Sequence, residues 1–124
     1  MDTNQTSLSI ALKYFNAWCQ NDFEKTSSFL SDKIAFEMLI NSYVSKAEFL
    51  QAVQFTASTL QEVILLTHLG NKEEAVLIYT LKLTGLAPLQ ICEHFKVRES
   101  KITFISHVHD THELRNAGFD KNKT

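Results

Sequence analysis

The last third of the sequence contains three consecutive segments that each have the pattern of a β-strand, and this run constrains the fold most. The segments are EAVLIYTLKLT (74–84), PLQICEHFKV (88–97) and KITFISHVHD (101–110). Each is rich in β-branched and aromatic residues. Turn-forming residues separate them, at Thr84-Gly85 and at 98–101. The run predicts a β-meander whose apolar face must be covered by other parts of the chain.

Three helices are predicted before the meander. Apolar residues recur at helical spacing over residues 8–19, which is typical of an amphipathic helix. A second, short helix is expected to begin at Asn21, because Asn21 and Glu24 have the spacing of a capping box. The segment SKAE (45–48) has the same pattern and predicts the start of a third helix.

Two further strands are predicted, at residues 33–40 and at about 61–69. The order of elements is therefore α-α-β-α-β-β-β-β. Helices followed by a run of strands favour an α+β domain, with the helices packed on one face of an antiparallel sheet. The 124 residues fit a single domain over 1–124, with a core at about 8–110 and a frayed tail at 113–124.

Composition argues against several classes of protein. With 44% hydrophobic and 21% charged residues, the chain is globular rather than disordered. A net charge of −2 and the absence of a Lys/Arg run argue against nucleic acid, and no apolar run is long enough to span a membrane. The polar start MDTNQTS predicts no signal peptide. Because Cys19 and Cys92 make no disulfide framework, we expect a cytoplasmic protein with both thiols reduced.

Two stretches carry a resemblance to a known family, YFNAWCQNDFEKTSSFLSDKIAFEM (14–38) and EHFKVRESKITFISHVHD (93–110). With them the chain resembles the nuclear transport factor 2-like superfamily, and its SnoaL-like and ketosteroid-isomerase-like members in particular. The resemblance implies a cystatin-like roll, in which a cone-shaped, curved antiparallel sheet wraps around three N-terminal helices and encloses a cavity. Members include isomerases, dehydratases, polyketide cyclases and inert scaffold proteins, so whether this chain is an enzyme stays open.

The resemblance also indicates candidate catalytic residues. Tyr14 and Glu93 fall where ketosteroid-isomerase-like members build an oxyanion hole from a tyrosine and a protonated acid. Alternatively, Glu93 is a buried acid that bonds Tyr14 and orders the core. The family's carboxylate base falls on Met38, which cannot accept a proton, so ketosteroid isomerase activity is not expected. Other members use an Asp/His pair as the base, and here Asp110 is the candidate acid while His107 is expected to face outward.

The predicted register of the last hairpin decides which residues face the cavity. A two-residue turn at Glu99-Ser100 would pair Val97 with Ile102, Phe95 with Phe104, Glu93 with Ser106, and Ile91 with Val108. The inward residues would then be Glu93, Phe95, Phe104, Ser106 and Asp110, and the outward residues Cys92, His94, His107 and His109. A shift of one residue would exchange the two sets.

These residues suggest two functions. The first is an apolar pocket for a ring-shaped or polyketide-like ligand, with Tyr14 and Glu93 as its polar centre and no cofactor. Its predicted lining is Trp18, Phe36, Met38, Phe49, Phe95, Phe104 and Ser106. The alternative is a non-catalytic scaffold or interaction module whose cavity is filled by its own side chains.

The outward set mixes cysteine and histidine, which is suitable chemistry for zinc. Ligands two residues apart on a strand are separated by about 7 Å, which is loose for a tetrahedral site. We therefore expect no metal site. Instead we expect a homodimer that buries the outer sheet face through Cys92, His94, His107 and His109, because that face would otherwise expose a large apolar patch.

Overall fold

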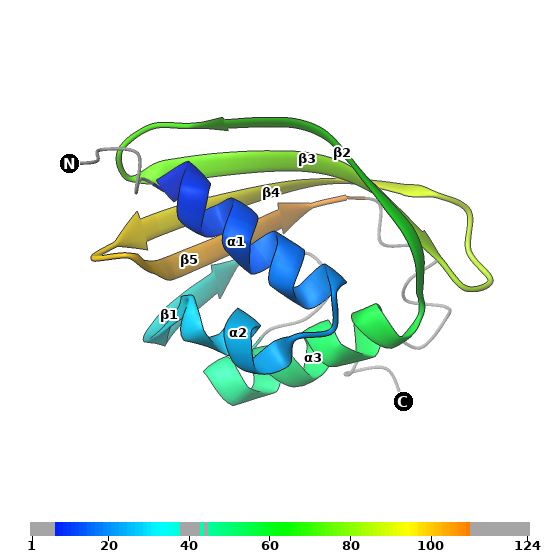
Figure 1. Ribbon diagram of the computed structural model, residues 1–124, viewed down its shortest axis with the longest axis horizontal. Coiled ribbons are helices and arrows are strands. Elements are labelled where there is room, and N and C mark those ends of the chain that lie inside the picture. Colours follow the sequence, from blue (N-terminus) through cyan, green and yellow to red (C-terminus); the bar gives the residue numbers. More distant parts are fainter. Residues whose placement is uncertain (1–6, 38–42, 44, 110–124) are drawn as a thin grey trace.

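The computed structural model describes residues 7–37, 43 and 45–109. Within these residues the chain forms helices α1 (Ser7–Cys19), α2 (Phe23–Ser28) and α3 (Lys46–Ser58), and strands β1 (Leu30–Glu37), β2 (Leu60–Gly70), β3 (Glu74–Leu83), β4 (Leu89–Arg98) and β5 (Lys101–Val108). The α+β order is the predicted one. Figure 1 shows a curved, open sheet with the helices on its concave side. Met38, Asp110 and the predicted frayed tail lie outside the described residues.

The strands are ordered β1-β5-β4-β3-β2 in one sheet. The pairs β2–β3, β3–β4 and β4–β5 are antiparallel, which confirms the meander. Strand β1 runs parallel to β5, so the sheet is mixed and the prediction of a wholly antiparallel sheet is wrong at this edge. The reason is topological: α3, β2, β3 and β4 lie between β1 and β5 in sequence, and a connection of that length allows parallel pairing.

The helix starts illustrate how local chemistry sets the boundaries. The Ser45 side chain accepts a hydrogen bond from the Glu48 backbone N–H at 3.1 Å, which confirms the predicted cap of α3. The predicted capping box at Asn21 and Glu24 is wrong by one residue. Asn21 has a left-handed φ of 63° after the end of α1, and Asp22 caps α2 by accepting from the Lys25 N–H at 3.1 Å.

Strand β1 (Leu30–Glu37) begins three residues earlier than predicted, at Leu30 rather than at 33, and the predicted residues 38–40 lie outside the described residues. Leu30 is fully buried (1% exposed) and pairs with Ile102 of β5. This long-range pairing extends the strand back through Ser31 and Asp32. None of the helices in the described part of the chain is long and apolar enough to cross a membrane.

Helix α1 forms the centre of the core. Its buried side chains pack on the concave face of the sheet, where the inward residues of β3 (Ala75, Leu77, Tyr79, Leu81 and Leu83) are at most 3% exposed. The Ser7 hydroxyl anchors the start of the helix by hydrogen bonds to the carbonyls of Asn71 and Glu74, each at 2.6 Å. The core is thus a helix laid across a strongly apolar sheet (Figure 1).

The β4–β5 hairpin has the predicted two-residue turn, because Arg98 pairs with Lys101 and Val97 with Ile102. Glu99 and Ser100 both have positive φ, 54° and 65°, as a type I′ turn requires. Beyond Val97 the predicted register is wrong. Lys96 pairs with Phe104 rather than with Thr103, so Thr103 is an extra residue, a β-bulge, and its hydroxyl bonds the Lys96 carbonyl at 3.3 Å.

Candidate functional site

The bulge at Thr103 exchanges the two faces of β5 for every residue that follows it. Glu93 pairs with His107 and His94 with Ser106, where the prediction paired Glu93 with Ser106. His107 was predicted to face outward, but the same bulge turns it to the concave side. There its Nε2 lies 2.6 Å from Oε2 of Glu93. A histidine that was assigned to the outer surface therefore meets the buried acid of the site.

Glu93 is the centre of this arrangement. Its side chain is 1% exposed, and among the described residues its hydrogen bonds run to Tyr79 and His107. The Tyr79 hydroxyl donates to Oε1 at 2.8 Å, while His107 contacts Oε2. Each carboxylate oxygen therefore has one partner, as a buried acid requires. We call the set Tyr79, Glu93 and His107 the acid–histidine cluster.

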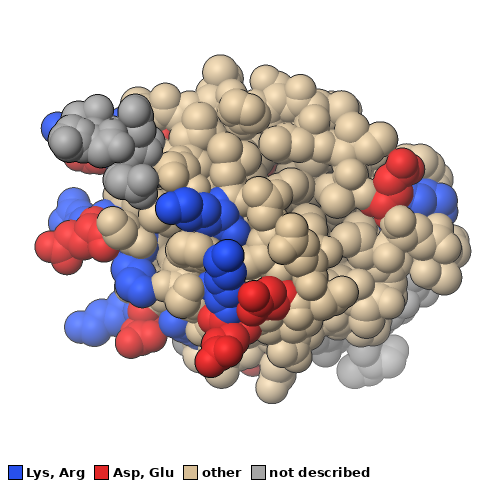
Figure 2. Space-filling view, viewed as in Figure 1, with Lys and Arg blue, Asp and Glu red and all other residues tan. Residues whose placement is uncertain are grey.

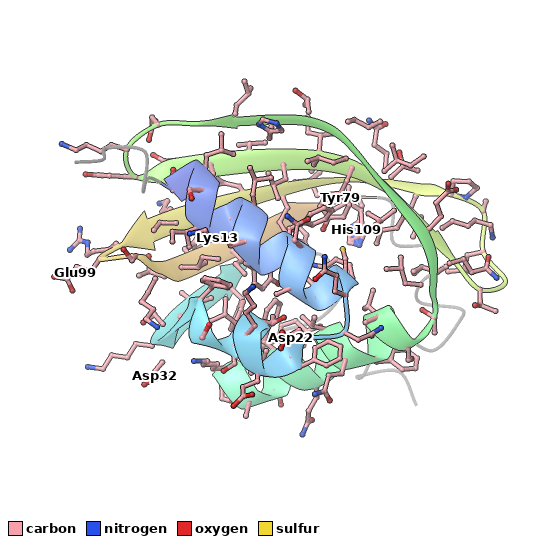
Figure 3. The ribbon with its side chains drawn as sticks, in the orientation of Figure 1. Lys13, Asp22, Asp32, Tyr79, Glu99 and His109 are labelled. Carbon is pink, nitrogen blue, oxygen red and sulfur yellow. The ribbon has the colours of Figure 1, made fainter. Side chains whose placement is uncertain are left out.

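One side of the cluster is closed and the other is open. Tyr79 is 2% exposed and packs against Phe15 with ring centroids 4.7 Å apart. The His107 side chain is 23% exposed, and its ring lies edge-on to that of His109 at 6.1 Å. Figure 3 shows the labelled Tyr79 and His109 close together in projection, beside the C-terminal half of α1. The imidazole of His107 is thus the part of the cluster that a ligand can reach.

Burial keeps the neighbouring hydroxyl and thiol groups protonated. Desolvation raises the pKa of Tyr14 well above 10, and the charge of Glu93 raises it further. The same two causes raise the pKa of Tyr79, to which its hydrogen bond with Glu93 contributes. Desolvation, with a smaller effect of Glu93, raises the pKa of Cys19 to about 12. All three groups therefore stay hydrogen-bond donors at neutral pH.

Tyr14 and Glu93 were predicted as the polar centre, and both are buried on the concave side, at 1% exposure each. Glu93 influences Tyr14 electrostatically, but the tyrosine that donates to its carboxylate is Tyr79. Sequence reasoning missed Tyr79 because β3 is apolar on both faces, so a tyrosine there has no distinguishing pattern. The pairing of β3 with β4 could have indicated it, because Tyr79 lies opposite Ile91, two residues before Glu93 on the same face of the sheet.

The predicted aromatic lining lies in two groups. Phe36 stacks on Phe49 with ring centroids 4.4 Å apart, and Tyr43 meets both rings edge-on. Phe95 is fully buried and contacts Tyr14 edge-on at 5.7 Å. Trp18, predicted with this set, is 4% exposed and packs edge-on against Phe15 at 5.9 Å. These side chains all lie beneath the concave face of the sheet.

Phe104 and Ser106 were predicted to line the cavity, and the bulge places both on the convex face. Phe104 pairs with Lys96, whose ammonium lies 5.1 Å from the Phe104 ring centroid. Ser106 pairs with His94, which remains on the convex face as predicted and bonds Glu74 at 2.8 Å. Cys92, opposite Val108, also lies on this face as predicted.

Among the described residues, a pocket lies at a different place from the predicted cavity. It has a volume of about 310 Å³ and lies at the β2–β3 turn, lined by Leu69, Gly70, Asn71, Glu74, Ala75, Val76 and His94. In the described ranges, no group of three or more His, Cys, Asp and Glu side chains is placed to hold a metal ion. A cavity beside Tyr14 and Glu93 therefore stays a prediction.

No family model and no curated protein matches the sequence. Solved structures do match its fold. An NTF2-like protein from Cytophaga hutchinsonii has a TM-score of 0.77 at 12% identity, over 93% of this chain and 96% of that chain. A steroid delta-isomerase from Pseudomonas aeruginosa has a TM-score of 0.72 at 10% identity, over 88% and 82%. An LEH-like epoxide hydrolase from M. tuberculosis has 0.70 at 17% identity, over 88% and 86%.

At these low identities, the structural similarity establishes the fold of the chain but no specific activity. The chain has the nuclear transport factor 2-like fold, which confirms the resemblance inferred from sequence at that level. Chemically, the acid–histidine cluster combines a carboxylate that orients an imidazole with buried hydroxyl donors nearby. An imidazole held in this way can accept a proton from a bound molecule and return it.

Proposed function

We propose that this protein is a small-molecule enzyme in which His107 acts as a general base on an apolar ring or polyketide-like ligand. The observation that carries the proposal is the 2.6 Å contact between Nε2 of His107 and the buried carboxylate of Glu93. A carboxylate in this position orients the imidazole and stabilises the imidazolium that forms when it takes a proton.

The fold supports this reading. The structures that share it include one named as a steroid delta-isomerase and one as an epoxide hydrolase, and both names denote reactions of small molecules. The predicted isomerase base position, Met38, cannot take a proton, so His107 supplies a base from a different strand. Tyr14 keeps its proton because burial raises its pKa, and it can therefore donate a hydrogen bond to an oxygen of the ligand.

The side chains around the cluster favour a neutral, apolar ligand. Phe95 packs on Tyr14, and Trp18 packs on Phe15, which contacts Tyr79. Phe95 and Trp18 are both at most 4% exposed, so the neighbourhood of the cluster on the concave side is aromatic. Among the described residues, the buried charged side chain is that of Glu93. A ligand carrying a carboxylate or phosphate would meet a like charge there.

The test begins with binding and then measures proton transfer. Steroids, polyketides and fatty acids are titrated against Trp18 fluorescence, and each ligand that binds is incubated with the protein in D₂O. We expect deuterium to enter the ligand next to a carbonyl group, as detected by mass spectrometry. His107→Gln should lose at least about tenfold of this exchange rate while still binding the ligand.

His94→Gln is the matched control. His94 also pairs with a glutamate, at 2.8 Å, but on the convex face, so the substitution should leave exchange unchanged. If no ligand in the panel binds, or if His107→Gln exchanges deuterium as fast as the natural chain, the proposed general base is refuted.

The alternative function, a dimerising module, is favoured by a separate observation. The convex face of the sheet exposes large apolar side chains on β2 and β5, with Ile64 at 48%, Leu69 at 65% and Val108 at 59%. Figure 2, which views the molecule from the side of the helices, shows most Lys, Arg, Asp and Glu at the left and lower middle, with a further acidic and basic group at the right end. We propose that a second copy of the chain covers the convex face through Cys92, His94 and Val108. His107 was also expected there but lies on the concave side, and the ring of His109, expected there too, lies 6.1 Å from the His107 ring.

Sedimentation at several protein concentrations tests this alternative. The natural chain should sediment as a dimer that dissociates on dilution, and Val108→Lys should shift it to the monomer. Phe55→Lys is the control, because Phe55 is similarly exposed (46%) but belongs to α3. A natural chain that stays monomeric at all concentrations contradicts the proposal.

A further inference from the structure

We propose that Nδ1 is the proton-accepting atom of His107, and that Glu93 and Tyr79 are positioning residues that fix this choice of nitrogen. The inference rests on the proposed function, since it names the atom through which His107 would act. It is carried by the geometry of the acid–histidine cluster. Its test requires no ligand.

The first step concerns the carboxylate. An ionised carboxylate can only accept hydrogen bonds. Nε2 of His107 lies 2.6 Å from Oε2 of Glu93, so the favourable neutral tautomer carries its hydrogen on Nε2 and donates it. Nδ1 then holds the lone pair. Among the described residues no hydrogen bond engages Nδ1 of His107, and the side chain is 23% exposed, so this lone pair is available to a bound molecule.

The second step concerns what holds the carboxylate. Tyr79 donates to the other oxygen, Oε1, at 2.8 Å. Because Tyr79 bonds one oxygen and His107 bonds the other, the carboxylate cannot rotate without breaking a buried hydrogen bond. Tyr79 is itself fixed, because it is 2% exposed and packs against Phe15 at 4.7 Å. Burial raises its pKa well above 10, so it remains a donor at every pH of interest.

The convex face offers an internal comparison. His94 contacts Oε1 of Glu74 at 2.8 Å, but the two side chains are 34% and 50% exposed. Water can replace either partner in that pair, so its tautomers should be close to those of a free imidazole. The buried acid–histidine cluster should instead hold one tautomer of His107 in excess.

Long-range ¹H–¹⁵N correlation NMR at a pH where the imidazoles are neutral distinguishes the tautomers directly. In the natural chain we expect the Nε2–H form of His107 to exceed the Nδ1–H form by at least about tenfold, because only one form makes the charge-assisted hydrogen bond. Glu93→Gln should reverse this preference. The amide oxygen can accept from Tyr79, which turns the NH₂ group toward His107 and makes Nε2 an acceptor.

Tyr79→Phe keeps the ring and removes the hydroxyl, so Oε1 loses its partner and the carboxylate is free to turn. We expect both tautomers of His107 to become populated. Tyr14→Phe is the matched control, since it removes a buried hydroxyl close to Glu93 that is not bonded to the carboxylate, and it should leave the His107 ratio unchanged. Circular dichroism confirms that each variant is folded.

An equal mixture of tautomers in the natural chain, or an excess of Nδ1–H, would overturn the assignment of Nδ1. An unchanged ratio in Tyr79→Phe would remove the role of Tyr79. These results are separable from the proposed function. A fixed tautomer together with no deuterium exchange would refute the general base alone, whereas exchange that depends on His107 together with averaged tautomers would refute only the present inference.

Discussion

Replacing Glu93 by alanine tests whether the acid–histidine cluster is as buried and as fully bonded as its geometry indicates. The substitution removes the acceptor of Tyr79, whose hydroxyl is then buried without a partner, at a cost of about 1–3 kcal/mol. The cavity left by the side chain adds about 1 kcal/mol. The His107 side chain is 23% exposed, so water can replace the carboxylate as its partner. Glu93→Ala should therefore lower the free energy of unfolding by about 2–4 kcal/mol.

Glu74→Ala provides the reference, because Glu74 makes the same kind of pair with His94 at nearly the same distance, 2.8 Å. The Glu74 side chain is 50% exposed. Exposed pairs contribute about 0.2–1 kcal/mol. Among the described residues no buried hydroxyl bonds the Glu74 carboxylate, and the hydrogen bond of Ser7 to the Glu74 backbone carbonyl is kept in the variant. The two substitutions remove the same functional group, so the difference between them isolates the effect of burial.

Urea unfolding at pH 7, followed by Trp18 fluorescence and extrapolated linearly to water, measures both free energies. Trp18 is 4% exposed in the folded chain, so its emission should change on unfolding. We expect Glu93→Ala to lose at least about 1 kcal/mol more than Glu74→Ala. Equal losses, or a more stable Glu93→Ala chain, would refute the reasoning, because a carboxylate whose removal leaves no buried donor unpaired cannot be holding Tyr79.

Three further outcomes follow from single residues. Cys19, whose pKa burial raises to about 12, should react with iodoacetamide at pH 8 on the order of a thousandfold more slowly than in the urea-unfolded chain, and an equal rate would contradict its burial. Ser45→Ala should lower the free energy of unfolding by about 1 kcal/mol, because the Glu48 N–H loses its cap; Ser45→Asp should retain stability. Gly85→Ala should cost about 1 kcal/mol through its φ of 82° alone, since open space surrounds the added methyl group, and Gly85→Asn should cost less.

The fold could be predicted because the helix caps and turns that bound its elements are set by neighbouring residues in the sequence. Ser45 caps α3 in both the prediction and the structure, and the turn at Glu99 and Ser100 was placed correctly. What could not be predicted depends on pairing between distant segments. Leu30 belongs to a strand because Ile102 pairs with it, 72 positions further along the chain, and residues 30–32 contain no local signal for that partner.

The candidate site was predicted only in part, because it too depends on pairing between distant strands. Tyr14 and Glu93 came from a family motif, and both lie buried on the concave side. The assignment of β5 residues to the inward or outward face assumed that side chains alternate along a regularly paired strand. Strand β5 is apolar at Ile102, Phe104, Ile105 and Val108, so each register buries some apolar residues, and the pattern could not exclude either one.

Buried polar groups discriminate between the two registers where apolar residues do not. In the regular register Glu93 would lie opposite Ser106, whose hydroxyl is a single weak donor. In the bulged register it lies opposite His107, and Oε2 gains a charge-assisted partner at 2.6 Å. Burying a carboxylate without adequate donors costs more free energy than the irregularity of one bulge. The position of Glu93 therefore favours the extra residue, Thr103, between Ile102 and His107 of β5. The side chain that gains a partner from this bulge is His107, which we propose as the base.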